Sequence, residues 1–387
     1  MISEWLESRL ACPVCLEPEG CLRCSLSKGT RCSCDQDYAR RVACACGGPE
    51  KVRLVRRQDG WQCPCCEHIY RSNEDGTCLE LVPPSAVGAV TQYADHEFHE
   101  RLGVKDTPPV LSAGIKIGMM LRMARPGADD HVLDLGCGAG KFALHTATTG
   151  AQVVGADIAP FFLARAARRL DLVQCDLRRL PFLKGSFDAG YSLDVLEHLD
   201  EPGVVEVLVE ARRVLCPSGR LFVYTHAMES SRLARFQRWV NRFAGWLDGR
   251  GLVDQKRERM RKSDHVNAIR SHEHFEALSA GAGLHVVQRR YYNVVFKALV
   301  EDLLLRMVEH ARKRKTPMAP RPGSAPTSHH QGPTGAGAPG RLEMMIARLL
   351  TWLLWLDVTL FGGIRTGPFF GLLRPATPIE AGKEGPT

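Results

Sequence analysis

Short apolar runs alternate with helix-length stretches through the middle of the chain. Residues 131–135, 151–157 and 172–176 have the length and apolar character of buried strands. The stretches between them, 141–149 and 161–169, are predicted as helices. Strands that alternate with helices are typical of a parallel sheet. We therefore expect an α/β fold over this part of the chain.

The same alternation continues toward the C-terminus. Residues 210–226 predict a helix, a Pro-Ser-Gly turn and a further strand, and residues 271–292 predict a helix, a glycine turn and another strand. Within a basic insertion at 229–262, arginines recur at spacings of three and four among aromatic residues, which predicts a helix with one basic and one apolar face; they are Arg232, Arg235, Arg238 and Arg242. The simplest interpretation is a solvated basic face on a helix packed against the core. The alternatives are a helix that caps the acceptor pocket and one that lies on phosphate. Residues 315–340 are dominated by Pro, Gly, Ser, Thr and Ala and predict a flexible excursion.

The apolar run at residues 344–362 has three interpretations. A membrane-spanning helix needs about twenty apolar residues, which this run nearly supplies. Arg348 and Asp357 lie inside its ends, and a charge at the centre of a span costs roughly 2.5 to 3.5 kcal/mol. We therefore favour a helix packed on the sheet, with an interfacial membrane helix and a true span as the alternatives.

Composition sets the size and environment of the protein. With 387 residues and 44% hydrophobic content, the chain is long enough for two or three domains with full cores. The net charge of +8 is too mild to indicate nucleic-acid binding by itself. The first ten residues are amphipathic and acidic, unlike a signal peptide, so we expect a cytoplasmic protein.

The segment 131–140, HVLDLGCGAG, carries the clearest chemical signal. An apolar strand with Asp134 runs directly into Gly136, Gly138 and Gly140. Glycines adopt backbone angles closed to other residues and let the main chain approach a ligand, and the next helix directs its N-terminus toward the same place. The pattern therefore predicts a loop that binds a nucleotide-type cofactor.

Two further strand ends add acidic residues to this loop. Asp157 ends the second strand about twenty residues after the glycines, where an acidic residue binds ribose hydroxyls in nucleotide-binding α/β folds. Asp176 ends the third strand. Together with the segment LRRLPFLKGSFDAGYSLDVLEHL after Asp176, these residues resemble class I S-adenosylmethionine (SAM) dependent methyltransferases of the type 11 kind.

The resemblance implies a Rossmann-like sheet of seven strands, in which GPFFGLLRP at 367–375 is the seventh, antiparallel edge strand. It also implies that SAM is the cofactor. Asp157 would accept the ribose hydroxyls, Asp176 the adenine amino group beside Leu177, and the glycine loop would make room for the methionine part. The cofactor contacts that the resemblance implies are Asp134, Gly136, Gly138, Gly140, Asp157, Ile158, Asp176, Leu177 and Tyr93.

Twelve of the 15 cysteines lie before residue 80. Because thiols stay reduced in the cytosol, the pairs spaced C-x2-C and C-x-C favour metal knuckles over disulfides. Two knuckles flank a predicted hairpin, which is the zinc-ribbon arrangement, and residues 61–76 resemble the second half of small zinc-ribbon proteins. We therefore assign one structural zinc to Cys44, Cys46, Cys63 and Cys66, with Cys65 competing for the last place. We expect a second zinc on Cys12 and Cys15 with two of Cys21, Cys24, Cys32 and Cys34. An iron–sulfur cluster or redox dithiols are the alternatives.

Methyl transfer from a sulfonium needs mainly in-line positioning of the acceptor. If a base acts, His198 is the first candidate, because a neutral imidazole takes a proton near neutral pH. Cys137, Cys175 and Cys216 are more typical of small buried side chains than of nucleophiles.

Three functions remain open. We favour methyl transfer to a small or lipid-like metabolite. The alternatives are a methyltransferase for RNA or protein that holds its substrate with the zinc module, and a non-catalytic zinc-ribbon adaptor. Peripheral contact with a membrane is compatible with the first.

These observations divide the chain as follows. We expect a Cys-rich double zinc-binding module at 1–82, a linker and N-terminal helices at 83–130, a SAM-binding core at 131–314 with the basic insertion at 229–262, the flexible excursion at 315–340, a C-terminal helix and last strand at 341–375, and a tail at 376–387.

Overall fold

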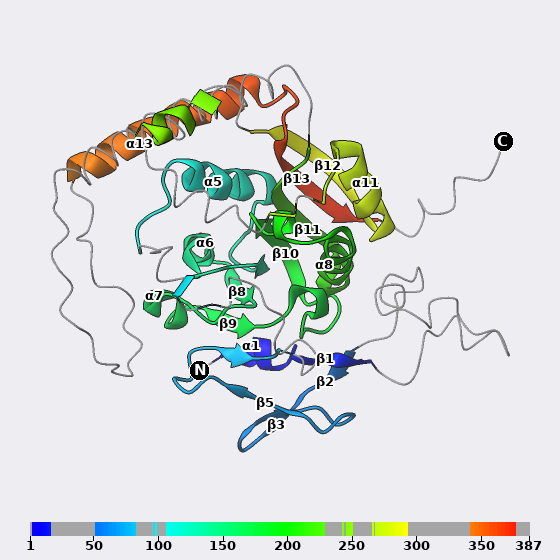
Figure 1. The fold of residues 1–387 in the computed structure, drawn as a ribbon. Helices are drawn as coiled ribbons and strands as arrows, with labels where there is room; N and C mark the ends of the chain where they lie inside the picture. Colours follow the sequence, from blue (N-terminus) through cyan, green and yellow to red (C-terminus); the bar gives the residue numbers. More distant parts are fainter. Residues whose placement is uncertain are drawn as a thin grey trace, which may run out of the picture.

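A computed structural model describes residues 2–16, 51–82, 95, 97–98, 106–228, 242–243, 245–250, 265–266, 268–292 and 341–376 (Figure 1). Within these residues a single large sheet runs through the molecule, with helices on both of its faces (Figure 1). The predicted α/β class is confirmed. Tyr93, the excursion at 315–340 and most of the basic insertion lie outside the described residues.

The described part of the large sheet has eleven strands, in the order β12-β13-β11-β10-β7-β8-β9-β6-β5-β4-β3. The C-terminal segment, residues 131–375, supplies β7 (His131–Leu135), β8 (Gln152–Asp157), β9 (Asp171–Gln174), β10 (Phe187–Leu193), β11 (Leu215–His226), β12 (Leu284–Tyr291) and β13 (Pro368–Pro375). The N-terminal segment supplies β3 (Val55–Arg57), β4 (Gly60–Gln62), β5 (Ile69–Ser72) and β6 (Leu79–Glu80).

The strands β9, β8, β7, β10 and β11 are mutually parallel, as the alternation of strands and helices predicts. In contrast, β13 is antiparallel to both of its neighbours. We expected it to be an edge strand, and this was wrong: β13 lies between β11 and β12, and β12 forms the edge. Seven of its eight residues are buried, which fits a strand with a partner on each side.

The sheet does not end at seven strands either. Strand β6 pairs in parallel with β9, at Leu79 opposite Val173 and Glu80 opposite Gln174. The N-terminal hairpins therefore continue the sheet of the C-terminal segment and cover the edge that β9 would otherwise expose. A sheet edge with unpaired backbone groups favours aggregation, so this pairing protects the C-terminal segment.

Two sets of helices cover the sheet. Helices α5 (Ser112–Ala124), α6 (Lys141–Thr146) and α7 (Ala164–Ala167) lie on one face, and α8 (Glu201–Val214) and α11 (His272–Gly281) lie on the other (Figure 1). The predicted helix at 141–149 is completed by the short 3-10 helix η3 (Ala147–Thr149). The predicted helix at 161–169 is reduced to the four residues of α7. Helix α8 begins at Asp200, whose side chain accepts a hydrogen bond from the Gly203 N–H.

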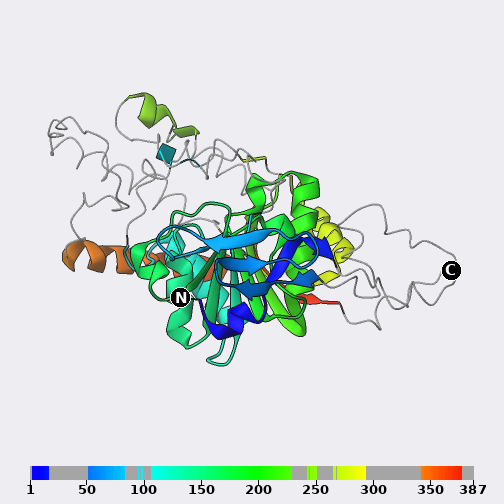
Figure 2. The ribbon, with the colours of Figure 1, turned by 90° about the horizontal axis from the view of Figure 1, so that it is seen from below.

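The N-terminal segment packs as part of the same core. Helix α1 (Glu4–Glu7) buries Leu6 completely, and Trp5 stacks on His131 with ring centroids 3.9 Å apart. Strands β1 (Ala11–Leu16) and β2 (Lys51–Arg53) form a small antiparallel pair beside it. Figure 2 shows these N-terminal elements lying across the C-terminal segment.

A buried charge cluster joins the two segments. Lys51 of β2 is fully buried, and its Nζ lies 3.1 Å from Oε2 of Glu210 in α8. Glu210 also binds Arg213, with 2.8 Å between Arg213 Nε and Glu210 Oε1. A buried charge without its partner is costly, so these three side chains favour one mutual placement of the two segments.

We expected the helix at 344–362 to pack on the sheet. Helix α13 (Arg341–Phe361) packs mainly on α5 and also contacts strand β12 at the edge of the sheet. Thr351 and Trp355 fit against Gly114 and Gly118, where a Cβ at Gly118 would lie 2.5 Å from Trp355 Cζ2. Arg122 lies 4.0 Å from the Trp355 ring centroid. Among the described residues, α13 is the one helix long and apolar enough to cross a membrane, with 17% of its Met344–Phe361 window buried.

Candidate functional site

The glycine loop after β7 has the conformation that its sequence predicts. Gly136, Gly138 and Gly140 have φ values of 81°, 52° and 80°, in the left-handed region that favours glycine. A Cβ at Gly136 would lie 2.3 Å from Val195 Cγ2, and one at Gly140 would lie 2.7 Å from Ala166 Cβ. Among the described residues, a Cβ at Gly138 would meet nothing within 4 Å. The outer two glycines therefore allow close packing, whereas Gly138 faces open space where a ligand can approach the backbone.

Asp157 lies beside this loop at the end of β8. Its Oδ2 accepts a hydrogen bond from the Gly138 N–H at 2.7 Å, and its Oδ1 accepts one from the Ala159 N–H at 2.9 Å. These two bonds orient the Asp157 carboxylate at the end of β8, beside the glycine loop. Ile158 follows it, half-buried, with its carbonyl accepting from Gln174.

Asp176 is brought to the same edge of the sheet. Gln174 is the register partner of Asp157, and Asp176 follows two residues later. The sequence did not indicate its main partner: Arg178 donates to both oxygens of Asp176, with 2.7 Å from Nη2 to Oδ2. Asp176 also accepts from the Arg178 N–H and so caps η4 (Leu177–Arg179). A ligand amino group at Asp176 would share the carboxylate with this guanidinium.

Asp134 lies beneath the loop and is only 1% exposed. Its Oδ2 accepts a hydrogen bond from the Tyr191 hydroxyl at 2.9 Å, and Tyr191 also contacts Thr146. Burial raises the pKa of Asp134 to about 8; the Tyr191 hydrogen bond lowers it and Asp157 raises it further. This position indicates that Asp134 supports the loop from below.

A second group of side chains lies where β10 and β11 end. Asp194 follows β10 with φ of 58°, and its N–H donates to the Tyr224 carbonyl. Its carboxylate forms a close ion pair with Lys116 of α5, whose Nζ lies 4.5 Å from the Tyr224 ring centroid. The next residue, Val195, is the one that contacts Gly136. The end of β10 therefore borders the glycine loop through Val195, and β11 lies next to β10 on the side away from β7.

His198 lies in this region, in η5 (Leu196–His198). Its ring meets that of His265 edge-on, with centroids 4.7 Å apart. Ligand atoms of Glu197, His198 and His265 all lie within 4.8 Å of one another. The sequence indicated His198 alone, because His265 is 67 residues away and no pattern connects it to the strand end.

A third cluster forms in the N-terminal module, where thiols of Cys12, Cys63 and Cys66 lie within 4.8 Å of one another. This differs from the partition we expected, which assigned Cys12 to a separate zinc. The reason is topological: β1 pairs with β2, and the chain then turns so that the end of β4 returns beside β1. Cys15 has a described backbone in β1 but no described side chain. Cys21, Cys24, Cys32, Cys34, Cys44 and Cys46 lie outside the described residues.

Residues 133–223 match the family model described as methyltransferase domain. The chain therefore carries a methyltransferase domain, and the predicted enzyme class is confirmed. The matched residues contain the glycine loop, Asp157, Asp176, Asp194 and His198. They do not include the N-terminal cysteines.

Two curated relatives match parts of the chain. A Caenorhabditis elegans protein named sterol 4-C-methyltransferase strm-1 is 34% identical over 103 residues, which is 24% of this chain and 30% of that protein. A Bos taurus protein named probable tRNA methyltransferase 9B is 31% identical over 116 residues, which is 30% of this chain and 25% of that protein. The chain thus spans under a third of the length of either relative.

Among solved structures, Haemonchus contortus phosphoethanolamine N-methyltransferase 2, bound to phosphomonomethylethanolamine and S-adenosylhomocysteine, is similar with a TM-score of 0.45 and 14% identity. The match covers 75% of this chain and 61% of that one.

Proposed function

We propose that this protein transfers a methyl group from SAM to a small or lipid-like acceptor. The observation that carries the proposal is the arrangement at Gly138. This residue faces open space at positive φ, its N–H is bound by Asp157, and both lie inside or beside the matched methyltransferase segment. We assign the ribose hydroxyls to Asp157, the adenine amino group to Asp176 and Leu177, and the methionine part to the loop from Gly136 to Gly140.

The chain's own part in the reaction is then mainly positional. When bound, SAM supplies an activated methyl group on a sulfonium. Val195, which follows β10, borders the glycine loop, and Asp194 and His198 lie close to it in the chain. We infer that this end of β10 holds an acceptor in line with that methyl group. His198 is our candidate for accepting the acceptor's proton where the acceptor carries one.

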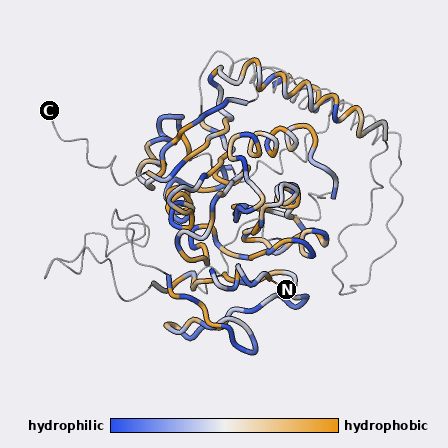
Figure 3. Tube along the Cα trace, turned by 180° about the vertical axis from the view of Figure 1, so that it is seen from behind, coloured by the Kyte–Doolittle hydropathy of each residue, from blue (hydrophilic) through white to orange (hydrophobic). Residues whose placement is uncertain are grey.

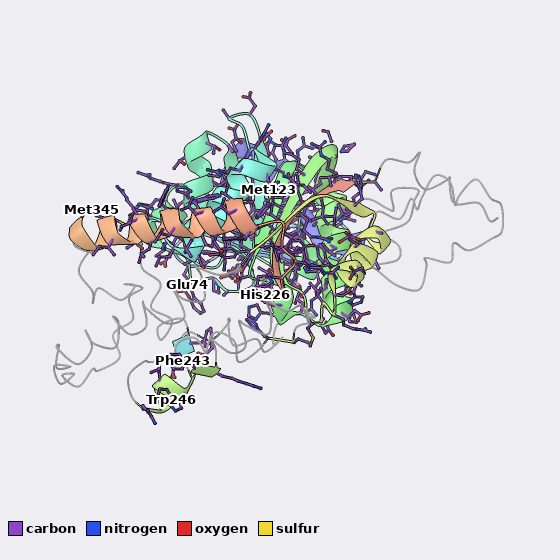
Figure 4. The ribbon with its side chains drawn as sticks, turned by 90° about the horizontal axis from the view of Figure 1, so that it is seen from above. Glu74, Met123, His226, Phe243, Trp246 and Met345 are labelled. Atoms are coloured by element: carbon purple, nitrogen blue, oxygen red, sulfur yellow. The ribbon has the colours of Figure 1, made fainter. Side chains whose placement is uncertain are left out.

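The exposed side of α13 supports a lipid-like acceptor over a purely water-soluble one. Met345, Leu349, Trp352 and Leu360 are 57% to 66% exposed, and their spacing places them on one face of the helix. Figure 3 shows apolar residues along the length of this helix, and Figure 4 shows Met345 at its outer end, beyond the body of the protein. The sterol relative accords with this acceptor class.

We infer that this face touches a membrane surface peripherally. Exposed apolar faces of this kind mark interaction sites, and Trp is favoured at the membrane interface. The net charge of +8 favours an anionic surface. Sedimentation with phosphatidylcholine–phosphatidylglycerol vesicles tests the inference: Trp352→Asp should lower the bound fraction, whereas Trp5→Phe, a change in the core, should leave it unchanged.

We propose a structural zinc ion on Cys12, Cys63 and Cys66, with Cys15 as the fourth ligand. Three thiols within 4.8 Å fit the donor set of a tetrahedral zinc site. Cys15 repeats the spacing of the other knuckle, because Cys12-Pro-Val-Cys15 matches Cys63-Pro-Cys-Cys66. The six cysteines between residues 21 and 46 remain for the second zinc. Reduced thiols accord with a cytoplasmic protein.

The acceptor class can be read from one assay. Purified protein is incubated with methyl-labelled SAM and with separate lipid, small-metabolite, RNA and protein fractions of the source cell. We expect label in the lipid or small-metabolite fraction. Label in RNA, the substrate type in the name of the tRNA methyltransferase relative, would favour the alternative in which the zinc module holds a macromolecule. If no fraction is labelled and SAM does not bind, the adaptor alternative replaces our proposal.

A further inference from the structure

The cluster of Glu197, His198 and His265 has the composition of a metal site. One carboxylate and two imidazoles bring their ligand atoms within 4.8 Å of one another. The His198 and His265 rings meet edge-on, with an interplanar angle of 87°. The backbone holds the two segments together, because the N–H of Val266 donates to the Glu197 carbonyl at 2.9 Å.

Glu197 is the anchor of this cluster. Its side chain is 1% exposed, and the Thr225 hydroxyl donates to its Oε2 at 3.2 Å. A third imidazole approaches it, since Nδ1 of His226 lies 3.4 Å from Oε1. That nitrogen is buried and makes no hydrogen bond within the described part of the chain. Figure 4 marks His226 on the body of the domain. Burying a carboxylate among imidazoles is costly unless positive charge compensates it.

We propose that Glu197, His198 and His265 bind a divalent transition-metal ion, with His226 beside it. Two imidazoles and one carboxylate favour ions such as Zn²⁺, Co²⁺ or Fe²⁺ over Ca²⁺ or Mg²⁺. In a tetrahedral zinc site with bonds of about 2.0 to 2.1 Å, ligand atoms lie roughly 3.3 Å apart. His198 and His265 are half-buried, so small rotations of their side chains can move the ring nitrogens. Movements of about 1 Å bring the ligand atoms to the spacing of a zinc site.

This site is chemically distinct from the cysteine cluster. It contains nitrogen and oxygen donors only, on residues after β10 and before α11, whereas the thiols belong to β1 and the turn after β4. Soft thiolate ligands and harder nitrogen and oxygen ligands prefer different metal ions. They also give a bound Co²⁺ ion different absorption spectra. The two sites can therefore be separated by spectroscopy as well as by mutation.

The role of the metal in the reaction rests on the proposed function, whereas the binding of the metal does not depend on it. Glu197 and His198 come two and three residues after Val195, which contacts the glycine loop at Gly136. A metal ion there would lie on the acceptor side of the cofactor. It would polarise an acceptor hydroxyl and lower its pKa, so that the O–H proton would pass to solvent water before the oxygen takes the methyl group. With the metal bound, His198 would serve as a ligand and not as the base. The acceptor class this implies is a hydroxyl or enol compound.

The experiment measures metal content and Co²⁺ spectra of the full chain. Wild-type protein and the variants His265→Ala, His198→Ala and Glu197→Gln are equilibrated with Zn²⁺ or Co²⁺, freed of unbound metal and analysed. Glu197→Gln keeps the shape of the side chain, and thermal melting shows which variants fold. His274→Ala is the matched control, because His274 also faces a glutamate, Glu201 at 3.6 Å, outside the cluster.

We expect His265→Ala, His198→Ala and Glu197→Gln each to lose one equivalent of bound metal, or to bind it more than about tenfold more weakly. Even mutations of residues that only support a metal ligand lower metal affinity about 10- to 100-fold. The spectrum of the Co²⁺ lost in each variant is the wild-type spectrum minus the variant spectrum. It should lack thiolate charge-transfer bands, because the proposed site has no cysteine ligand. The control should match wild type. Equal metal content and affinity in wild type and folded Glu197→Gln would overturn the proposal. Metal binding without SAM binding would retain it and reject the proposed function instead.

Discussion

The Gly138 N–H donates a hydrogen bond to Oδ2 of Asp157 at 2.7 Å, so the loop after β7 and the end of β8 act as one unit. The bond joins two neighbouring strands at their carboxyl ends, which is where ligands bind in open α/β sheets. It also fixes which face of the Asp157 carboxylate remains available. The predictions below follow from this unit and from the contacts that hold the rest of the domain around it.

The glycines of the loop should respond differently to alanine. At Gly138 an added Cβ has space in the fold but projects where the cofactor backbone contact would form. We expect Gly138→Ala to cost about 1 to 2 kcal/mol of stability from its left-handed backbone, and to weaken SAM binding about tenfold or more. Calorimetry and thermal melting measure the two effects.

Gly136→Ala is the matched comparison. Its Cβ would lie 2.3 Å from Val195 Cγ2, so the core must shift. Overpacking of this kind costs about 1 to 3 kcal/mol, and the backbone strain adds to it. A Gly138 variant that loses as much stability as the Gly136 variant, yet binds SAM normally, would show that Gly138 does not face the cofactor.

The charge cluster between the two segments predicts a stability loss in acid. Burial raises the pKa of Glu210, but Arg213 and Lys51 outweigh it and hold the pKa at about 2, below its usual 4.5. Because the pKa is lower in the folded chain, the carboxylate stabilises the fold fully above pH 4.5. That contribution is lost as the pH falls from 4.5 toward 2. Urea unfolding across this range measures it.

Glu210→Gln should remove this acid-dependent contribution and lower the free energy of unfolding at pH 7 by about 3 to 5 kcal/mol, since it leaves Lys51 and Arg213 buried without their partner. Glu206→Gln is the control on the same helix. Glu206 is 25% exposed and lies 3.4 Å from Arg179, so its loss should cost under about 1 kcal/mol. Equal losses in the two variants would contradict the role given to the cluster.

The N-terminal thiols predict a contrast between adjacent cysteines. Cys66 is in the cluster with Cys12, with sulfur atoms 3.9 Å apart, whereas Cys65 contributes its backbone N–H to Cys63 Sγ. We expect Cys66→Ser to lose one zinc and much stability, since metal binding at such sites is coupled to folding. Cys65→Ser should keep the zinc. Metal analysis with the reverse result would move the ligand to Cys65.

The strands, helices and candidate cofactor residues around the glycine loop could be predicted from the sequence, because the patterns that indicate them are local. Each strand end, glycine and acidic residue at 131–176 is defined within a few residues of chain. The continuation of the sheet into the N-terminal hairpins could not be predicted, because β6 is two residues long and its pairing with β9 spans about ninety residues. The position of Cys12 and the meeting of His198 with His265 depend on tertiary contacts in the same way.

The place of β13 inside the sheet predicts the effect of C-terminal truncation. A chain ending at residue 340 loses the strand between β11 and β12, together with the helix that covers α5. We expect it to aggregate or lose SAM binding, because β12 and β11 are left with unpaired edges. Size-exclusion chromatography measures the first effect.

A chain ending at residue 376 keeps β13 and is the control, which should remain monodisperse and bind SAM. If the chain ending at 340 were more soluble than the full chain and still bound SAM, α13 would be a dispensable membrane anchor and not a part of the domain.

Calorimetric titration of SAM into the full-length protein and into Asp157→Ala tests the central claim most directly. Asp129→Ala, an exposed aspartate before β7, is the control. Removing the charge-assisted hydrogen bonds to ribose should cost roughly 1.5 to 3 kcal/mol, which is about a ten- to a hundredfold loss of affinity. The account predicts that wild type and Asp129→Ala bind SAM alike and that Asp157→Ala binds it this much more weakly. Equal affinity in all three proteins, or no binding to wild type, would contradict it.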